Sequence, residues 1–363
     1  MSRRVGEKDI SGCAISGIFN RKGLRFSGEA IIKSIALMRE RSNGLGGGFA
    51  AYGIYPQHSD AYACHIFYDH LKAREDVEHF FNKHFCITLA EEIPTRKLKA
   101  IGRPPLIWRY FIQADRQRLE RSNLTEDEYV VQCVMRINAQ YKGAFIASCG
   151  KNMGVFKGVA YPEEIGEFFR LEDYQAYLWT AHGRFPTNTP GWWGGAHPFT
   201  LLDWSIVHNG EISSYGANKR FLEMYGYQCS LMTDTEVITY LFDLLVRKKK
   251  LPMNLVVKAL AAPLWSEIEQ MEEKEAGQFK AIRAIYGSAL LNGPFSIILG
   301  HRNGFLALND RIKLRPLVVA EEQDVIYVAS EESAIREVCP QPARLYFPRG
   351  GEAVIGELEG RSQ

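Results

Sequence analysis

Apolar residues recur along this chain with two different spacings, which predict both strands and helices. An unbroken apolar run predicts a buried strand over Cys13–Phe19. Ile31, Ile35 and Met38 are spaced by four and three residues and predict one face of a helix. Ser27 stands where it can cap that helix, and a glycine-rich loop follows it.

The second half of the chain has more strand-like runs, separated by turn residues. The expected strands are Ala176–Phe185, Trp204–Ile212, Phe295–His301, Phe305–Leu308, Leu317–Ala320, Val325–Ala329, Ala343–Phe347 and Ala353–Leu358. Thr233–Glu236 should open a helix with Val237 and Leu241 on its apolar face, with more helix up to about Tyr286. Many strands together with several long helices predict layered α/β or α+β packing.

The stretch 57–170 is less regular and is interpreted as an insertion between core strands. Within it, Ala61–Tyr68 is strand-like and Glu75–Lys83 is helix-like. Thr125–Glu128 has the spacing of a capping box before a helical apolar stripe. Glu91–Arg109 contains basic residues and three prolines and is expected at the surface.

Composition excludes several classes of protein. The chain has 363 residues, 46% hydrophobic and 24% charged, which rules out wholesale disorder, collagen and coiled coil. Its net charge of +2 gives no footprint for nucleic acid or an acidic membrane. No apolar run is long enough for a membrane span or a signal peptide, so a cytoplasmic location is expected. The seven cysteines form no CxxC pair, and we expect mostly reduced, buried thiols.

Two residues stand out as candidates for chemistry. Cys13 follows Gly12, and cutting that bond would give Cys13 both a thiol and an α-amine titrating near pH ~7.7–8.0. The alternative is a buried structural thiol. Arg184, near the end of a predicted strand, could clamp a substrate carboxylate in bidentate fashion, or it could be a surface arginine.

Two further segments have both a structural and a functional interpretation. Asn209-Gly210 could be a hairpin turn, as expected for Asn303-Gly304. Alternatively, the Asn209 amide and the Gly210 N–H could donate to an oxyanion. Asp234 lies in a predicted capping box and could compensate a helix dipole, bind a substrate ammonium, or do both.

Three histidines raise the question of a metal site, but the pattern argues against one. His182, His197 and His208 fit no zinc spacing, and no cysteine pair or acidic partner accompanies them. We therefore expect no bound metal and interpret these histidines as hydrogen-bonded structural residues.

Taken in order, these motifs resemble a class II glutamine amidotransferase, a family of N-terminal-nucleophile hydrolases, and in particular the amidotransferase part of glutamate synthase. The resemblance is carried by Cys13–Tyr55, Arg184–Phe199, His208–Ile212, Leu308–Pro316 and Val328–Glu331. It implies an α+β fold, a four-layer αββα sandwich with an insertion. It also implies that residues 1–12 are a leader to be removed and that 13–363 form one amidotransferase domain.

The resemblance also implies the chemistry. Cys13 would be the nucleophile and its α-amine the base, while Asn209 and Gly210 would form the oxyanion hole. Glutamine would be hydrolysed to glutamate and ammonia through a thioester. Ala14 departs from the family, which mostly has glycine after the cysteine, and its added methyl group could narrow the pocket.

For substrate binding, the resemblance implies that Arg184 holds the glutamine α-carboxylate and Asp234 its α-ammonium, with Thr187 in the same binding loop. No segment resembles a flavin-binding barrel or an iron–sulfur cysteine cluster, so no cofactor is expected. The expected partner is a separate flavin-dependent synthase subunit that receives the ammonia.

Two other functions remain open from the sequence. The chain could be a non-catalytic regulatory or scaffold subunit of a synthase complex that retains the amidotransferase fold. It could also be an N-terminal-nucleophile amidase with another substrate, although Arg184 and Asp234 together suit an amino-acid head group.

Overall fold

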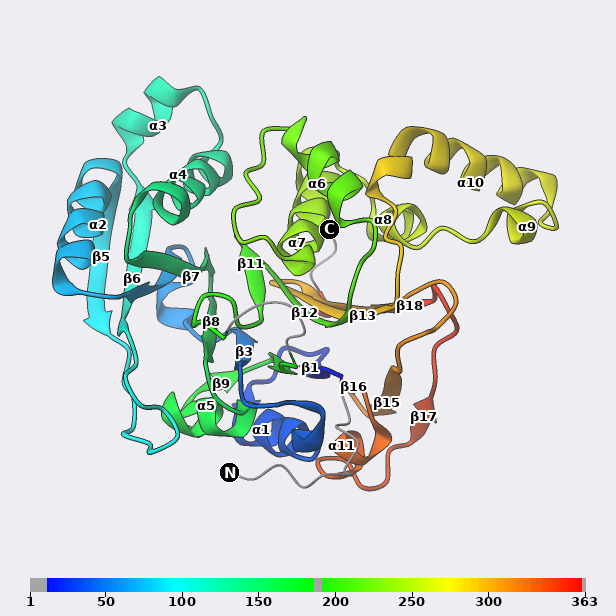
Figure 1. Cartoon of the computed structure of the whole chain (residues 1–363), viewed down its shortest axis with the longest axis horizontal. Helices are drawn as coiled ribbons and strands as arrows, with labels where there is room; N and C mark the ends of the chain where they lie inside the picture. The colour runs from blue at the N-terminus through cyan, green and yellow to red at the C-terminus, as the bar shows by residue number, and fades with distance from the viewer. Residues whose placement is uncertain (1–11, 186–190, 361–363) are drawn as a thin grey trace, which may run out of the picture.

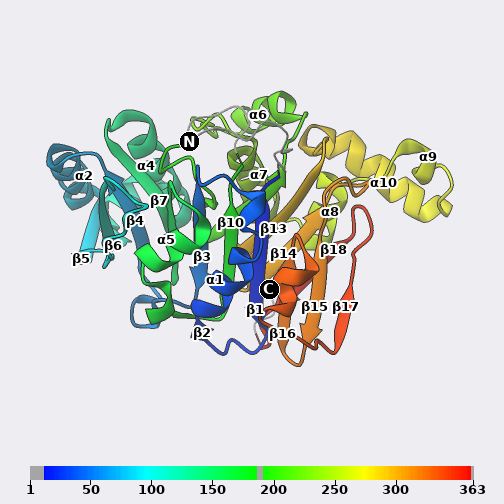
Figure 2. The ribbon, with the colours of Figure 1, turned by 60° about the horizontal axis from the view of Figure 1, so that its bottom comes forward.

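Two antiparallel sheets stacked face to face form the centre of the molecule (Figures 1 and 2). The computed structural model describes residues 12–185 and 191–360. The larger sheet has the order β17-β15-β16-β1-β10-β3-β8 and the smaller the order β11-β12-β13-β14-β18. In chain order these strands are β1 (Ala14–Asn20), β3 (Gly47–Tyr52), β8 (Met153–Gly158), β10 (Leu178–Gly183), β11 (Phe199–Leu201), β12 (Trp204–Gly210), β13 (Phe295–His301), β14 (Gly304–Asn309), β15 (Val318–Glu322), β16 (Val325–Ala329), β17 (Arg344–Tyr346) and β18 (Ala353–Glu357).

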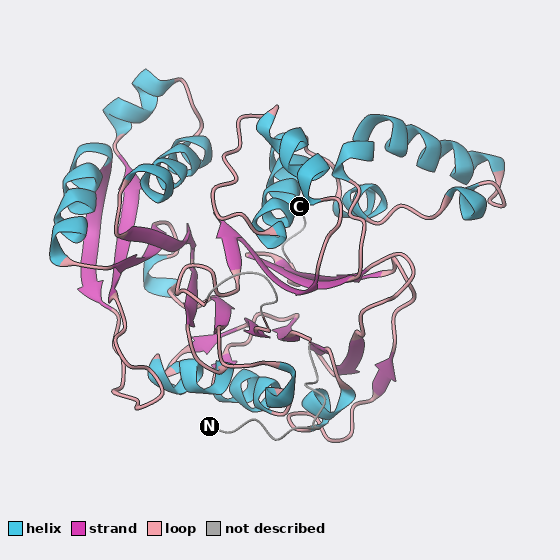
Figure 3. Ribbon diagram, in the orientation of Figure 1, coloured by secondary structure: helices cyan, strands magenta, loops and turns pink. Residues whose placement is uncertain are grey.

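Helices cover the outer faces of both sheets, as Figure 3 shows. The larger sheet carries α1, α5 and α11, and the smaller carries α7 with α6 beside it. The bounds are α1 (Glu29–Ala36), α5 (Pro162–Phe168), α6 (Tyr215–Glu223), α7 (Asp234–Phe242), α8 (Met253–Leu260), α9 (Trp265–Ile268), α10 (Glu273–Tyr286) and α11 (Glu332–Arg336). The sequence of helix, sheet, sheet and helix layers confirms the predicted four-layer αββα fold of the α+β class.

Alternation along β1 explains how one strand contributes to two apolar layers. Ile15 and Phe19 are buried between the sheets, in one cluster with Ile298 of β13. Ala14 and Ile18 point to the opposite face, toward the cluster that contains residues of α1. Successive strand residues face opposite sides of a sheet, and burying each large apolar side chain contributes about 1.5–3 kcal/mol. The strand that begins next to the predicted nucleophile is therefore firmly held.

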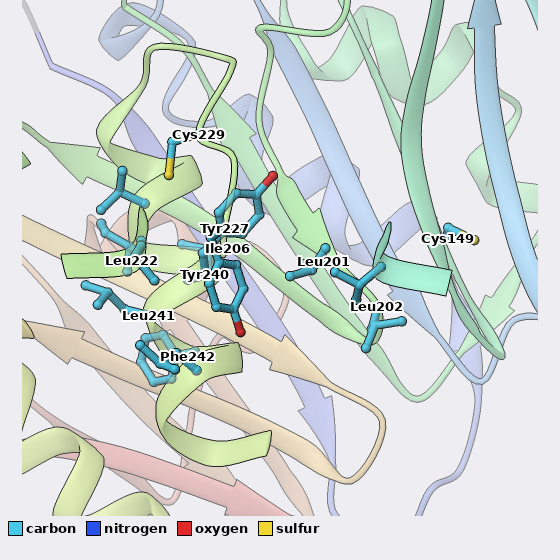
Figure 4. Packing of buried hydrophobic residues seen from close by; sticks show 14 of the residues in the cluster. Cys149, Leu201, Leu202, Ile206, Leu222, Tyr227, Cys229, Tyr240, Leu241 and Phe242 are labelled. Carbon is cyan, nitrogen blue, oxygen red and sulfur yellow. The ribbon is translucent and has the colours of Figure 1, made fainter. Parts of the chain in front are cut away.

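Packing also fixes the position of α7. Its residues Leu241 and Phe242 lie in one buried cluster with Leu222 of α6 and with Leu201 and Ile206 of the smaller sheet (Figure 4). Both α7 residues are fully buried. The helix therefore lies against β11 and β12, and its first turn is held near the end of β12.

The part of the chain between β3 and β8 forms an additional four-stranded sheet with the order β5-β6-β4-β7, while β3 and β8 themselves pair with each other. Its elements are β4 (Tyr62–Tyr68), α2 (Leu71–His84), β5 (Phe85–Glu92), β6 (Leu106–Ala114), α3 (Arg116–Ser122), α4 (Glu126–Gln140) and β7 (Ala144–Lys151). The predicted insertion 57–170 contains this sheet, but it also contains β8 and α5, which belong to the core layers. The added part is thus shorter than expected.

Some local features differ from the sequence predictions. Helix α1 begins at Glu29 after Gly28, and Ser27 only accepts the N–H of Glu29 at 3.2 Å from just before the helix. The further helix expected up to about Tyr286 is present as α8, α9 and α10. Cys64 and Cys149 face each other on β4 and β7 and form a disulfide, whereas we expected reduced thiols.

Candidate active site

A cavity of about 270 Å³ lies where β1 begins, β10 and β12 end and α7 begins. Four of the predicted residues line it, namely Cys13, Arg184, Gly210 and Asp234. These residues are distant in sequence but meet in space. Cys13 and Arg184 are neighbours because the start of β1 pairs with the end of β10, while Gly210 ends β12 of the facing sheet and Asp234 begins α7. The fold therefore brings a thiol, a cation and a carboxylate together around one space.

The sulfur of Cys13 accepts a hydrogen bond from the N–H of Phe185 at 3.4 Å. Burial raises the pKa of the Cys13 thiol. The Phe185 hydrogen bond and the positive charges of Arg184 and Arg315 act in the opposite direction but do not outweigh it. Because the thiolate is the nucleophile, a thiol in this state needs a base before it can attack a substrate.

The position of Arg184 depends on the glycine-rich loop before β3. Its N–H donates to the carbonyl oxygen of Gly46 at 2.8 Å. A methyl group added at Gly46 would lie 2.9 Å from Cδ of Arg184, so glycine leaves room for the side chain. Burial lowers the pKa of Arg184, as expected for a cation held partly out of water. The predicted Thr187 lies outside the described residues.

Asp234 is the first residue of α7 and is held from two sides. Its carboxylate accepts the N–H of Ile212 at 3.0 Å, and Oδ1 lies 3.6 Å from Nδ1 of His208. Burial alone would raise the pKa of Asp234, but His208 and the hydrogen bonds outweigh it and hold the pKa below its usual value. The predicted capping box is absent, since Glu236 instead accepts N–H groups of the preceding loop.

Asn209 and Gly210 end strand β12 and do not form a hairpin turn. Gly210 lines the cavity, and a side chain there is excluded because its Cβ would lie 2.0 Å from the carbonyl oxygen of Pro294. Asn209 is buried and is not among the cavity-lining residues. Its amide donates to the hydroxyl of Ser330 at 3.5 Å.

Two histidines of the cavity wall were not predicted as site residues, because the sequence pattern excluded a metal site and favoured a structural role. His197 and His208 both line the cavity. The ring of His182 stacks on His197 at 3.9 Å and donates from Nε2 to the His208 carbonyl at 2.9 Å. A period of two along β12, which places His208 on the same face as Gly210, could have revealed this side chain.

Burial keeps the two stacked histidines, His182 and His197, in the neutral form. Burial lowers the pKa of His182 to about 3 and that of His197 well below its usual value, so both rings are neutral near pH 7. Among the described residues, no group of three or more His, Cys, Asp or Glu side chains could hold a metal ion. In the same part of the chain, no helix is both long and apolar enough to cross a bilayer.

Comparison with known proteins identifies the family. The model of the class-II glutamine amidotransferases matches residues 92–341, well over half of the chain. An uncharacterized protein of Archaeoglobus fulgidus is 51% identical over 360 residues, which cover 98% of this chain and 95% of that protein. The chain therefore belongs to the class-II glutamine amidotransferases. The matched range includes Arg184, Asn209, Gly210 and Asp234, and Cys13 lies outside it.

Named relatives are more distant. The large chain of NADPH glutamate synthase from Bacillus subtilis is 25% identical over 240 residues, which cover 59% of this chain and 15% of that protein. The solved glutamine phosphoribosylpyrophosphate amidotransferase of B. subtilis is 15% identical, with a TM-score of 0.46, over 96% of this chain and 48% of that one. This chain thus spans less than half the length of either protein.

Proposed function

We propose that the protein hydrolyses glutamine to glutamate and ammonia in this cavity. The observation that carries the proposal is the joint placement of the Cys13 thiol, the Arg184 guanidinium and the Asp234 carboxylate around one space. Glutamine carries an α-carboxylate and an α-ammonium that complement the two charges. Its side-chain amide is an electrophile that a thiolate can attack. Membership of the amidotransferase family supports the same substrate.

The two charged residues would hold the amino-acid head group. Arg184 can donate two parallel hydrogen bonds to the α-carboxylate, a geometry that lysine lacks. Asp234 would accept hydrogen bonds from the α-ammonium, and its lowered pKa keeps it ionised for this purpose. The attraction between opposite charges is stronger in a partly buried cavity than in water, because the effective dielectric constant is lower. We assign Thr187 to the same binding loop on the basis of its motif.

Activation of the nucleophile would require removal of residues 1–12. Cleavage of the Gly12–Cys13 bond leaves an α-amine on Cys13, and this amine takes the proton of the thiol. The thiolate attacks the amide carbon, and a tetrahedral oxyanion forms. The C–N bond then breaks, and ammonia leaves with the proton that the amine returns. Water hydrolyses the γ-glutamyl thioester, which releases glutamate and restores the thiol.

Asn209 and Gly210 would stabilise the oxyanion. Gly210 presents its backbone to the cavity without a side chain in the way. The Asn209 amide has two hydrogens, and one is directed to Ser330. The second hydrogen would be donated to the oxyanion, although Asn209 is not itself among the cavity-lining residues. Loss of one such donor typically lowers kcat by about 10²–10³.

The ammonia would pass to a separate, flavin-dependent subunit of the glutamate synthase type. This part of the proposal is supported by the sequence motifs and by the similarity to the B. subtilis large chain, of which this chain matches only 15%. The B. subtilis protein is much longer than the matched part, which is consistent with further functions residing elsewhere. Co-purification of the natural partner from the source cells, followed by mass determination, would test this step.

Glutamate release from glutamine by the purified full chain tests the central proposal. We expect activity in samples whose intact mass corresponds to a start at Cys13, and none in Cys13→Ala, which should also retain residues 1–12. Activity in a sample that still carries residues 1–12 would contradict the mechanism. No activity in a chain that starts at Cys13 and still binds glutamine would favour the regulatory or scaffold function.

A further inference from the structure

We propose that Arg41, supported by Glu331, is a positioning residue that fixes the backbone of Cys13 and keeps its α-amine in the basic form. The inference rests on the proposed function and extends it to a residue outside the cavity lining. Arg41 ends a short 3₁₀ turn, Arg39–Arg41, that follows α1. From this turn its side chain reaches the residue before β1, and Arg41 is not among the residues that line the cavity.

The Arg41 guanidinium makes two well-defined contacts. Nε donates to the carbonyl oxygen of Cys13 at 3.1 Å, and Nη1 donates to Oε1 of Glu331 at 2.9 Å. The Arg41 side chain is 18% exposed, so its charge is only partly screened by water. Glu331 thus orients the guanidinium, and the guanidinium holds the main chain of the nucleophile.

The residue before Glu331 holds the same segment from another direction. Ser330 donates its N–H to the carbonyl oxygen of Ile15 at 3.0 Å and accepts the N–H of Ile15 at 3.2 Å with its hydroxyl. Cys13 is therefore fixed between the Arg41 contact and this pair of hydrogen bonds. A chain end without such ties frays, and a misplacement of about 1 Å in an active site can cost about 10²-fold in rate.

Arg41 also borders the bond whose cleavage creates the α-amine. A methyl group added at Gly12 would lie 3.2 Å from Nη2 of Arg41, so the guanidinium extends along the Gly12–Cys13 peptide. A positive charge beside an amine disfavours its ammonium form and so favours the free base. The negative charge of Glu331 has the opposite effect and favours the ammonium form. If Arg41 were replaced by a neutral residue, Glu331 would raise the pKa of the α-amine without opposition from Arg41.

Other charged groups also act on Cys13, and a substitution of Arg41 leaves them unchanged. They are Arg184, Arg315 and Asp234, and each influences the Cys13 thiol. None of them is paired with Arg41 or Glu331 in the described structure. A change of residue 41 therefore alters the field at the α-amine and leaves the charges around the substrate in place.

The test compares Arg41→Gln with Arg41→Lys and with the control Arg39→Gln, each as the mature chain that begins at Cys13. Arg39 belongs to the same turn but pairs with Glu163 and Glu164. For Arg41→Gln we expect kcat to fall about 10- to 100-fold with less than a threefold change in KM. The acidic limb of the kcat/KM profile should move up by roughly 0.5–1 pH unit. Arg41→Lys should restore the limb, and Arg39→Gln should match the wild type.

Three results would overturn the inference. They are an unchanged acidic limb in Arg41→Gln, an effect on KM alone, or the same loss in Arg39→Gln, which would indicate a general structural defect of the turn. A thermal unfolding midpoint for each variant identifies that last case. Failure of the proposed function has a different signature, because the wild-type mature chain itself would then release no glutamate.

Discussion

Replacement of Asp234 by Asn tests how the cavity recognises an amino acid. The change removes the negative charge and conserves the size of the side chain. The carboxylate accepts the N–H of Ile212 at 3.0 Å, and an amide oxygen can accept the same bond, so the start of α7 should keep its structure. A hydrogen bond between charged groups contributes roughly 1.5–3 kcal/mol. Since 1.4 kcal/mol is tenfold in affinity, KM for glutamine should rise by about 10- to 150-fold.

A second substrate shows whether the lost interaction involves the α-ammonium. Glutaramate is glutamine without its α-amino group. The wild type should prefer glutamine over glutaramate in kcat/KM, and Asp234→Asn should lose most of that preference. Asp173→Asn is the matched control, because Asp173 is a surface carboxylate paired with Arg170. It should leave both substrates unaffected.

The pH dependence provides an independent check. The pKa of Asp234 is held below its usual value of ~3.9, so the carboxylate is ionised across the range from pH 5 to pH 7. In the wild type, protonation of Asp234 should therefore not raise KM for glutamine between pH 7 and pH 5. An unchanged KM in Asp234→Asn, or an equal rise for glutamine and glutaramate, would refute the assignment of this residue to the ammonium.

Three further changes test other parts of the site. Asn209→Ala should lower kcat by about 10²–10³ with little change in KM, whereas the exposed Asn82→Ala should have no effect, and equal losses would contradict the oxyanion role. Gly210→Ala would place Cβ 2.0 Å from the Pro294 oxygen, so both the unfolding midpoint and the activity should fall, and a variant of wild-type stability would contradict the structure. Burial raises the pKa of Glu236 to about 7, against ~4.3 when unfolded, so the stability it contributes is complete below pH ~4.3 and is lost as the pH rises through 7. The free energy of unfolding in urea should therefore fall between pH 5 and pH 8, and it should fall less in Glu236→Gln than in the wild type. Equal decreases would refute the assignment of this pH dependence to Glu236.

Two identical dipeptides show what local sequence can and cannot predict. Asn303-Gly304 lies in the expected hairpin, where Arg302 and Asn303 form the turn between β13 and β14 and Gly304 begins β14. Asn209-Gly210 ends β12 instead, and its glycine is required by the backbone at Pro294. The difference comes from a contact between segments more than eighty residues apart, which no local pattern contains. The ordered set of motifs was enough to predict a function for Asn209-Gly210. The conformation of this dipeptide could be known only from the folded structure.

The added sheet shows a second limit. Its strands β5 and β6 were not predicted, although their ends fall inside the segment Glu91–Arg109 that we expected at the surface. β5 alternates between covered and exposed positions, and its exposed side includes Cys86 and Glu92. The three prolines lie in the connection to β6 and hide the pairing of two strands. A strand that is covered on only one face and is followed by a proline-rich loop therefore has the sequence pattern of an irregular surface segment.

The groups around the cavity favour the proposed role of the Cys13 α-amine as the base. The thiol has a raised pKa, so it is protonated near neutral pH and needs a proton acceptor. The pKa of His182 is about 3 and that of His197 lies well below its usual value, which makes both rings weak bases. The Nδ1 atom of His208 faces Thr235 and Asp234. An α-amine with a pKa of ~7.7–8.0 matches the requirement, because it is basic enough to accept the proton and acidic enough to return it to ammonia. Removal of residues 1–12 would then be a chemical step in making the catalyst as well as a way to open the site.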